Sequence, residues 1–188
     1  MRKSLKREFF VRPTLTVARD LLGKYLVRKV DRKILVGKVV ETEAYIGPQD
    51  KASHAFGFKR TKRNEAEYLI GGHVYIYLVY GMYWQFNIST NRVNAPECVL
   101  IRALEPVNEN FKVANGPGKL CRWLKLDKSF YGEDVTKSKC LWFEDRGTKI
   151  KKSEIVASPR IGIDYAGPVW AQKTWRFYLK NNSAVSLK

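Results

Sequence analysis

The stretch Val39–His54, VVETEAYIGPQDKASH, has the pattern of a strand that ends in a loop. Successive side chains of a strand point to opposite faces, so Glu41, Glu43 and Tyr45 should share one face. Gly47-Pro48 then ends the alternation and begins a turn. A carboxylate beside an aromatic ring at a strand end suits a functional site, because strands hold side chains rigidly and loops admit ligands. The alternative is an ordinary solvated strand face.

The composition indicates one folded domain that binds a polyanion. With 188 residues and 45% hydrophobic side chains, the chain can bury a core and should form a single domain over residues 1–188. Lys and Arg number 35 against 18 Asp and Glu, and the net charge of +17 points to nucleic acid first and an anionic membrane surface second. An aromatic content of 13% suits a protein that also stacks on bases.

The remaining features of the composition exclude several classes of protein. Three cysteines without paired spacing and only two histidines predict reduced thiols in an intracellular protein, with no metal site and no cofactor. The basic lead-in at residues 1–8 is not followed by the apolar region of a signal peptide, and no apolar run is long enough to span a membrane. We expect a monomer with a frayed end at residues 181–188.

The hydrophobic patterns predict an α+β fold. A short helix should follow Pro13, with Gly23 as its C-cap, and a second helical stretch should cover residues 120–126. The predicted strands are 25–30, 34–45, 97–104, 155–163 and 175–179. Because the connections resemble tight hairpin turns, we expect a curved, mainly antiparallel sheet with a protruding β-hairpin and flanking helices.

Residues 73–90, HVYIYLVYGMYWQFNIST, predict that hairpin, with a tight turn near Gly81. The turn would place Tyr80 at an exposed tip, where an aromatic ring could wedge into a base stack. Tyr77 lies three residues earlier, and Asn87 lies on the return strand, where its amide could contact a base edge. The alternative is that these aromatic side chains only fill the faces of the sheet.

Further polar candidates lie in the loop 46–64 and in a predicted strand. The loop contains His54, which alone is more often structural than functional. It also contains four cations that either contact phosphates or form a solvated basic loop, namely Lys59, Arg60, Lys62 and Arg63. Arg102 interrupts an apolar strand, and a half-buried arginine needs an anionic partner, for which Glu43 and a DNA phosphate are candidates.

Together these stretches resemble the alkyladenine (3-methylpurine) DNA glycosylase family, from about Phe9 to Leu179. The motifs that carry the resemblance are VETEAY (40–45), TKRN (61–64), YIYLVYGMY (75–83), NIS (87–89), IRALEP (101–106), NGPGKLC (115–121) and SPRIGIDYAG (158–167). The resemblance implies a DNA repair enzyme that flips damaged purines out of double-stranded DNA. Its substrates would be alkylated or deaminated purines of the 3-methyladenine, 7-methylguanine, hypoxanthine and ethenoadenine class.

The resemblance also implies roles in catalysis. Glu43 would be the general base that activates the attacking water, and Arg102 would hold that water and Glu43. We expect Arg102 to keep the pKa of Glu43 low. Because no lysine is positioned as a Schiff-base nucleophile, the enzyme should be monofunctional and leave an abasic site without cutting the strand.

Roles in recognition follow from the same resemblance. Tyr45, His54 and Tyr77 would wall the pocket around the flipped base, with the main-chain amide of His54 at the base edge. Asn87 would clash with the amino group of normal guanine. Tyr80 would fill the gap that the flipped nucleotide leaves in the duplex.

The sequence departs from the family pattern between Pro106 and Asn115, where only eight residues stand in place of a longer basic segment. DNA contacts made by that segment are therefore in doubt. The short lead-in favours a compact microbial form, located in the cytoplasm with the nucleoid, whereas a eukaryotic form would be nuclear. Two rival functions are a non-catalytic basic nucleic-acid-binding protein and a nucleic-acid hydrolase that attacks phosphodiesters, which normally needs a metal cluster.

Overall fold

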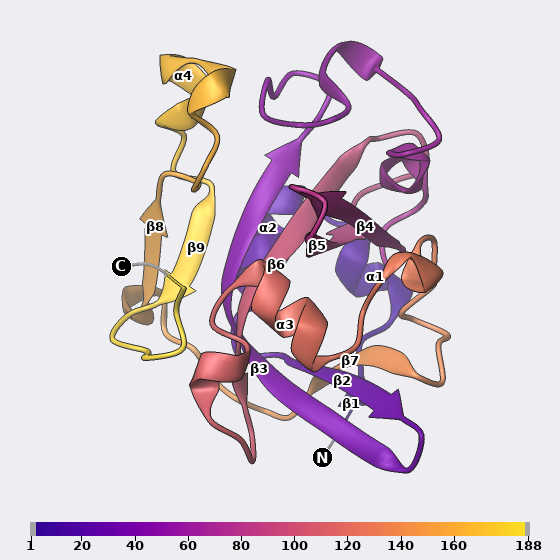
Figure 1. The fold of residues 1–188 in the computed structure, drawn as a ribbon. Helices are drawn as coiled ribbons and strands as arrows, with labels where there is room; N and C mark the ends of the chain where they lie inside the picture. Colours follow the sequence, from indigo (N-terminus) through magenta and orange to yellow (C-terminus); the bar gives the residue numbers. More distant parts are fainter. Residues whose placement is uncertain (1–2, 187–188) are drawn as a thin grey trace.

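The long strand β3 (Lys33–Ile46) runs through the middle of the molecule and carries the first half of the stretch quoted above (Figure 1). The structure, a computed structural model, describes residues 3–186. β3 pairs antiparallel with β2 (Tyr25–Val30) through a tight turn. The predicted hairpin at this point of the chain is confirmed, with Lys33 already in the return strand.

Within the described residues, nine strands form one sheet in which every pairing is antiparallel. The other strands are β1 (Lys3–Ser4), β4 (Val74–Val79), β5 (Tyr83–Ser89), β6 (Glu97–Pro106), β7 (Leu141–Asp145), β8 (Ile155–Ser158) and β9 (Arg176–Leu179). The main order is β1-β7-β2-β3-β6-β5-β4, and β8 and β9 branch off beside the second half of β3 (Figure 1). The prediction of a mainly antiparallel α+β fold is confirmed.

Two register shifts between β3 and β6 bend the sheet next to the candidate carboxylates. They fall on either side of Glu41 and leave Val40 on β3 and Arg102 on β6 without a residue directly opposite. Bulges of this kind increase the local twist and redirect side chains. They account for the curvature that the sequence pattern led us to expect.

Helices cover parts of the sheet and its ends. The α-helices are α1 (Arg7–Phe10), α2 (Thr14–Asp20), α3 (Pro117–Trp123) and α4 (Pro168–Ala171). The 3-10 helices are Phe56–Phe58, Glu65–Tyr68, Phe111–Val113, Lys128–Phe130, Lys152–Glu154 and Asp164–Ala166. No helix between residues 3 and 186 has the length and apolar content to cross a membrane.

Proline explains where two elements differ from the prediction, at the start of a helix and at the end of a strand. The helix predicted at 120–126 begins at Pro117, because proline fits the first turn of a helix, where its missing N–H is not needed. The strand predicted at 155–163 ends at Ser158, because Pro159 cannot donate a hydrogen bond to a neighbouring strand.

The two faces of β3 have different surroundings. Val40 and Ala44 are buried in the main hydrophobic core, and the hydroxyl of Thr42 donates a hydrogen bond to the Ala18 carbonyl of α2 at 2.9 Å. The opposite face carries Glu43 and its neighbours. The predicted alternation therefore holds, and it separates a face that packs on the core from a face that carries the candidate site.

The β4–β5 hairpin is confirmed with the predicted tip. Tyr80 and Gly81 both have positive φ, 53° and 68°, and the Met82 N–H donates to the Val79 carbonyl at 3.2 Å. Positive φ at both central residues gives a turn whose twist matches the flanking strands. The Tyr80 side chain is 85% exposed.

Both ends of the chain are tied to the rest of the fold within the described residues. The basic lead-in contributes β1, which pairs with β7, so it is part of the sheet. At the other end Ala184 and Val185 are buried, and the Ser186 N–H donates to Glu41 Oε2 at 2.7 Å. The expectation of a frayed end is thus wrong for residues 184–186, because apolar burial and a hydrogen bond hold them, while residues 187–188 lie outside the described range.

Candidate active site

Glu43 lies in the second half of β3 with its side chain fully buried. Its Oε2 accepts a hydrogen bond from the Tyr45 hydroxyl at 2.9 Å, and its Oε1 accepts one from the Ile161 backbone N–H at 2.9 Å. The Arg102 Nη1 atom lies 3.5 Å from the same Oε1. The carboxylate is therefore held in one orientation by groups from β3, β6 and the segment after β8.

Arg102 bridges two buried carboxylates on the same face of β3. Its Nε lies 3.4 Å from Glu41 Oε1, which also accepts a hydrogen bond from Arg176 Nε at 2.6 Å. Arg102 Nε further donates to the Ser186 hydroxyl at 3.2 Å. The prediction that Arg102 finds an anionic partner in Glu43 is confirmed, and Glu41 is a second partner. The face is buried, so its interpretation as a solvated strand face is wrong.

Burial raises the pKa of Glu43 above its ordinary value of 4.5. Loss of hydration is the largest cause, because it disfavours the charged form. Arg102 and the hydrogen bonds from Ile161 and Tyr45 lower the pKa, and the charge of Glu41 raises it. The expectation that Arg102 keeps this pKa low is therefore wrong in its net direction. When ionised, Glu43 is a stronger base than an exposed glutamate.

A cavity of about 610 Å³ opens beside this carboxylate. This volume is in the range of small-molecule sites. Three residues that contact the Glu43 carboxylate line this cavity, namely Tyr45, Arg102 and Ile161. The other predicted site residues that line the cavity are His54, Arg63, Tyr77, Tyr80 and Asn87. Tertiary folding thus brings most of the predicted residues together.

Aromatic rings form one side of the cavity. The His54 ring packs edge to face on Tyr77 with 4.6 Å between centroids, and its Nδ1 lies 2.6 Å from the Tyr75 hydroxyl. The pKa of His54 is lowered to about 4 because packed rings remove hydration and because Arg63 and Lys59 lie nearby. His54 is therefore neutral at physiological pH, although one side of it remains exposed at the cavity.

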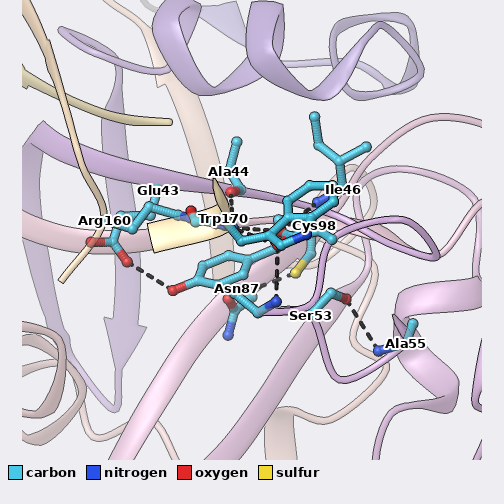
Figure 2. Close-up of polar contacts among 12 residues, drawn as sticks. Glu43, Ala44, Ile46, Ser53, Ala55, Asn87, Cys98, Arg160 and Trp170 are labelled. Carbon is cyan, nitrogen blue, oxygen red and sulfur yellow. Dashed lines mark hydrogen bonds and ion pairs between the residues drawn. The ribbon is translucent and has the colours of Figure 1, made fainter. Parts of the chain in front are cut away.

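Asn87 is 1% exposed and anchored by its amide nitrogen. Nδ2 donates to the carbonyl oxygens of Tyr75 at 3.2 Å and Gln85 at 3.1 Å. The Asn87 Oδ1 and the Cys98 sulfur point toward one another at 3.8 Å (Figure 2). Since both amide hydrogens are committed, Asn87 can present only an acceptor to a ligand.

The predicted phosphate-contacting cations are all exposed. Arg60 forms an ion pair with Glu65 at 3.3 Å, and its guanidinium lies over the Tyr68 ring. Arg63 reaches the cavity wall and lies 5.5 Å from the centroid of the Tyr77 ring. In the described part of the chain no ion pair holds Lys59 or Lys62. These two lysines are the freest of the four to contact a phosphate.

A buried ion pair that braces the site was not predicted from the sequence. Asp50 and Arg160 are both fully buried at their side chains and form two hydrogen bonds, of 2.5 and 2.9 Å. Arg160 also donates to the Ala44 carbonyl at 2.9 Å, and its guanidinium lies 4.7 Å from the centroid of the Tyr45 ring (Figure 2). Because the partners are 110 residues apart, spacing carried no signal for the pair.

A second overlooked residue is Glu67, which is 1% exposed and lines the cavity. It lies in a short polar segment, EAEY, that is typical of a solvated turn. Among residues 3–186 no group of three or more histidine, cysteine, aspartate or glutamate side chains is arranged to hold a metal ion.

Comparisons with a family of known proteins and with individual relatives match nearly the whole chain. The methylpurine-DNA glycosylase (MPG) family matches residues 8–183. A protein of Methanocella arvoryzae is 46% identical over 195 residues, which cover 97% of this chain and 95% of the relative. A protein of Natranaerobius thermophilus is 41% identical, with 97% and 98% covered, and one of Clostridioides difficile is 40% identical, with 94% and 100% covered. Each of the three carries the name "Putative 3-methyladenine DNA glycosylase".

Proposed function

Because the chain belongs to the methylpurine-DNA glycosylase family of DNA repair enzymes, we propose that it hydrolyses the N-glycosidic bond of damaged purines in duplex DNA. The substrates would be alkylated or deaminated purines, and the product an abasic site. The observation that carries the proposal is the buried Glu43 carboxylate, which is fixed by three residues that line an aromatic cavity.

Glu43 is suited to the role of general base. Breaking an N-glycosidic bond passes through an oxocarbenium-like state, as in glycoside hydrolysis. An ionised carboxylate can take a proton from the attacking water and offset the developing positive charge. Arg102 and Ile161, which contact Glu43 and line the cavity, would orient that water.

The cavity is suited to a flipped purine. An alkylated purine carries positive charge, and the electron-rich rings of Tyr45 and Tyr77, which both line the cavity, favour a cation. The main-chain amide of His54 and the Oδ1 of Asn87 would meet the edges of the base. Because Asn87 is anchored by two carbonyl oxygens, it cannot move aside for a base that does not fit.

The hairpin tip and the surface charge are suited to duplex DNA. A base inside a duplex must leave the stack before chemistry can reach it, at a cost of a few kcal/mol. The exposed Tyr80 ring lies at the rim of the cavity and would fill the gap in the stack. The net charge of +17 would bind phosphates without reading sequence.

We further propose that the enzyme is monofunctional. The groups around the cavity include carboxylates, tyrosines, a histidine and arginines, and the cavity wall in the described residues contains no lysine that could form a Schiff base. The reaction would therefore end at the abasic site, and the strand would break only after alkali.

The test is single-turnover excision from a duplex with one ethenoadenine, in EDTA, with and without alkali. Wild-type protein should release the base without metal, and the strand should break only after alkali. Glu43→Gln should slow release by about 10²–10⁴-fold, the usual contribution of a general base, while still binding the lesion duplex. Glu105→Gln is the control, because this substitution also removes one carboxylate charge. Glu105 pairs with Lys38, and neither residue lines the cavity.

Each outcome discriminates between the candidate functions. Undiminished release by Glu43→Gln would rule out Glu43 as the base. Strand breakage without alkali would exclude a monofunctional enzyme. If the wild type releases neither ethenoadenine nor methylated purines but binds DNA, the chain is a basic binding protein on the same scaffold.

A further inference from the structure

Glu67 has a carboxyl oxygen that the folded protein leaves without a partner. The residue belongs to the 3-10 helix Glu65–Tyr68 and lines the same cavity as Tyr77 and Asn87. Its Oε1 accepts a hydrogen bond from the Cys98 thiol at 3.4 Å, whereas its Oε2 is buried and has no hydrogen-bond partner among the described residues. An unsatisfied buried polar group costs about 1–3 kcal/mol, so such a group at a cavity wall indicates that a ligand completes it.

No hydrogen bond from a neighbouring side chain reaches Oε2 in the described residues. The nearby Asn64 amide already donates both hydrogens, to the carbonyl oxygens of His54 at 3.2 Å and Lys59 at 2.8 Å. No lysine or arginine in the described residues forms an ion pair with Glu67. The titratable groups that face it are Asp50 from the loop after β3, Tyr75 and Tyr77 from β4, Cys98 from β6, Tyr68 and Tyr131.

This environment keeps a proton on Glu67. Burial is the main cause that raises its pKa from the ordinary 4.5 to about 8, and the charge of Asp50 adds to it. The hydrogen bond from the Cys98 thiol and the nearby Asn64 amide lower the pKa only in part. At neutral pH the side chain of this cavity-lining residue is therefore mostly a neutral carboxylic acid, which has a proton to donate.

We propose that Glu67 is a second catalytic residue, the acid that protonates a neutral purine such as hypoxanthine as it leaves. This inference rests on the proposed function. A purine alkylated on a ring nitrogen already carries the positive charge that makes it a good leaving group. A neutral purine must instead gain a proton on a ring nitrogen, and a free carboxylic acid at the cavity wall can supply it.

In this reaction one glutamate donates a proton and the other accepts one. Glu67 Oε2–H gives its proton to a ring nitrogen of hypoxanthine, and the electron pair of the C1′–N9 bond goes to the departing base. The water oxygen bonds to C1′ and loses a proton to Glu43. The products are free hypoxanthine, an abasic site, ionised Glu67 and protonated Glu43, and exchange with solvent restores both side chains. Two carboxyl groups kept in different protonation states are a recurring arrangement for acid and base roles.

The test compares a neutral with a cationic leaving base in the same variants. Single-turnover release is measured from a duplex with one hypoxanthine and from dimethyl-sulfate-treated DNA, which carries 7-methylguanine. Glu67→Gln keeps the shape but cannot transfer a proton, and Glu67→Met removes the polar group. Both should slow hypoxanthine release by about 100-fold, as expected for the loss of a general acid, and leave 7-methylguanine release near the wild-type rate. Glu65→Gln, an exposed neighbour in the same turn, is the control.

The pH dependence gives a readout that a structural role would not change. Wild-type hypoxanthine release should fall as the pH rises through about 8, and this decline should disappear in both variants. Unchanged hypoxanthine release, or an equal loss on both substrates, would overturn the proposal. If Glu67→Met releases hypoxanthine slowly but Glu67→Gln does not, Glu67 only forms a hydrogen bond to the base and transfers no proton. That result would also overturn the proposal. Wild-type release of 7-methylguanine without hypoxanthine would refute only the role of Glu67, whereas release of neither would refute the proposed function itself.

Discussion

Replacing Asp50 by asparagine should destabilise the protein strongly, although the substitution only exchanges one carboxylate oxygen for an amide NH2 group. Asp50 forms two hydrogen bonds with Arg160, and both side chains are fully buried. Its oxygens also accept the backbone N–H groups of Ile46 at 3.3 Å and Ala52 at 3.0 Å. The substitution therefore leaves a buried guanidinium without a counter-charge and weakens the turn after β3.

The magnitude follows from this burial. Removing one partner of a buried ion pair costs about 3–5 kcal/mol, because the remaining charge loses its compensation. Asparagine can still accept some of the hydrogen bonds, so we expect about 3 kcal/mol. For a domain of this size that corresponds to a melting temperature lower by roughly 6–12 °C. Ile161, next to Arg160, donates to Glu43, so we also expect slower excision at temperatures where the variant is folded.

Urea denaturation and thermal melts of Asp50→Asn, which give the free energy of unfolding and the melting temperature, test this prediction. Asp20→Asn is the matched control, because Asp20 also pairs with an arginine, Arg12, at 2.8 Å, but the two side chains are 48% and 34% exposed. An exposed pair contributes about 0–1 kcal/mol, so this control should melt close to the wild type.

A loss below about 1 kcal/mol in Asp50→Asn would refute the reasoning, because it would place the pair in the range of surface ion pairs. A double-mutant cycle with Arg160→Met adds a second check. The two substitutions should be less destabilising together than the sum of their separate effects, since the double variant leaves no unpaired buried charge.

Three further predictions concern the tip, the acid and the basic loop. Tyr80→Ala should slow excision from duplex DNA by about tenfold, about 1.4 kcal/mol, but not from single-stranded DNA, with a melting temperature close to the wild type because the ring is exposed. The wild type should lose stability as the pH rises from 4.5 to about 8, because in this range its folded state keeps a proton on Glu67 that its unfolded chain releases. Glu67→Gln has no such proton, so its melting temperature relative to the wild type should rise over the same range. Replacing Lys59 and Lys62 by alanine should flatten the slope of log K for DNA against log salt by about 0.9 for each phosphate that is no longer bound, and an unchanged slope would show that neither lysine contacts DNA.

Local patterns were sufficient for the strand and hairpin that carry the site. The alternation around Glu43 and the Gly-Pro turn placed a carboxylate and a tyrosine on one face at a strand end. The glycine after Tyr80 placed an aromatic side chain at an exposed tip. These predictions depended on neighbours within a few residues, whose geometry the backbone dictates directly.

Contacts between distant segments were beyond such patterns. Asp50 and Arg160 each look like surface residues in the sequence, and only the fold shows that they bury one another. The pKa of Glu43 was predicted in the wrong direction because the sequence showed a cation nearby but not the depth of burial, which outweighs it. Glu67 gave no signal, because it lies in a short polar segment whose burial depends on distant parts of the chain.

The amino-acid order alone was enough to predict the antiparallel α+β class, the hairpin and its tip, the net positive charge, and the residues that resemble a glycosylase site. The charge and protonation state of each of those residues follow from tertiary packing. Packing β3, β4 and β6 around one cavity buries Glu43 beside Arg102 and Glu67 beside Cys98. The first carboxyl group has a cationic partner, and the second has no ion-pair partner among the described residues. Protonation depends on burial and charge from all directions, and these quantities exist only once the chain has folded.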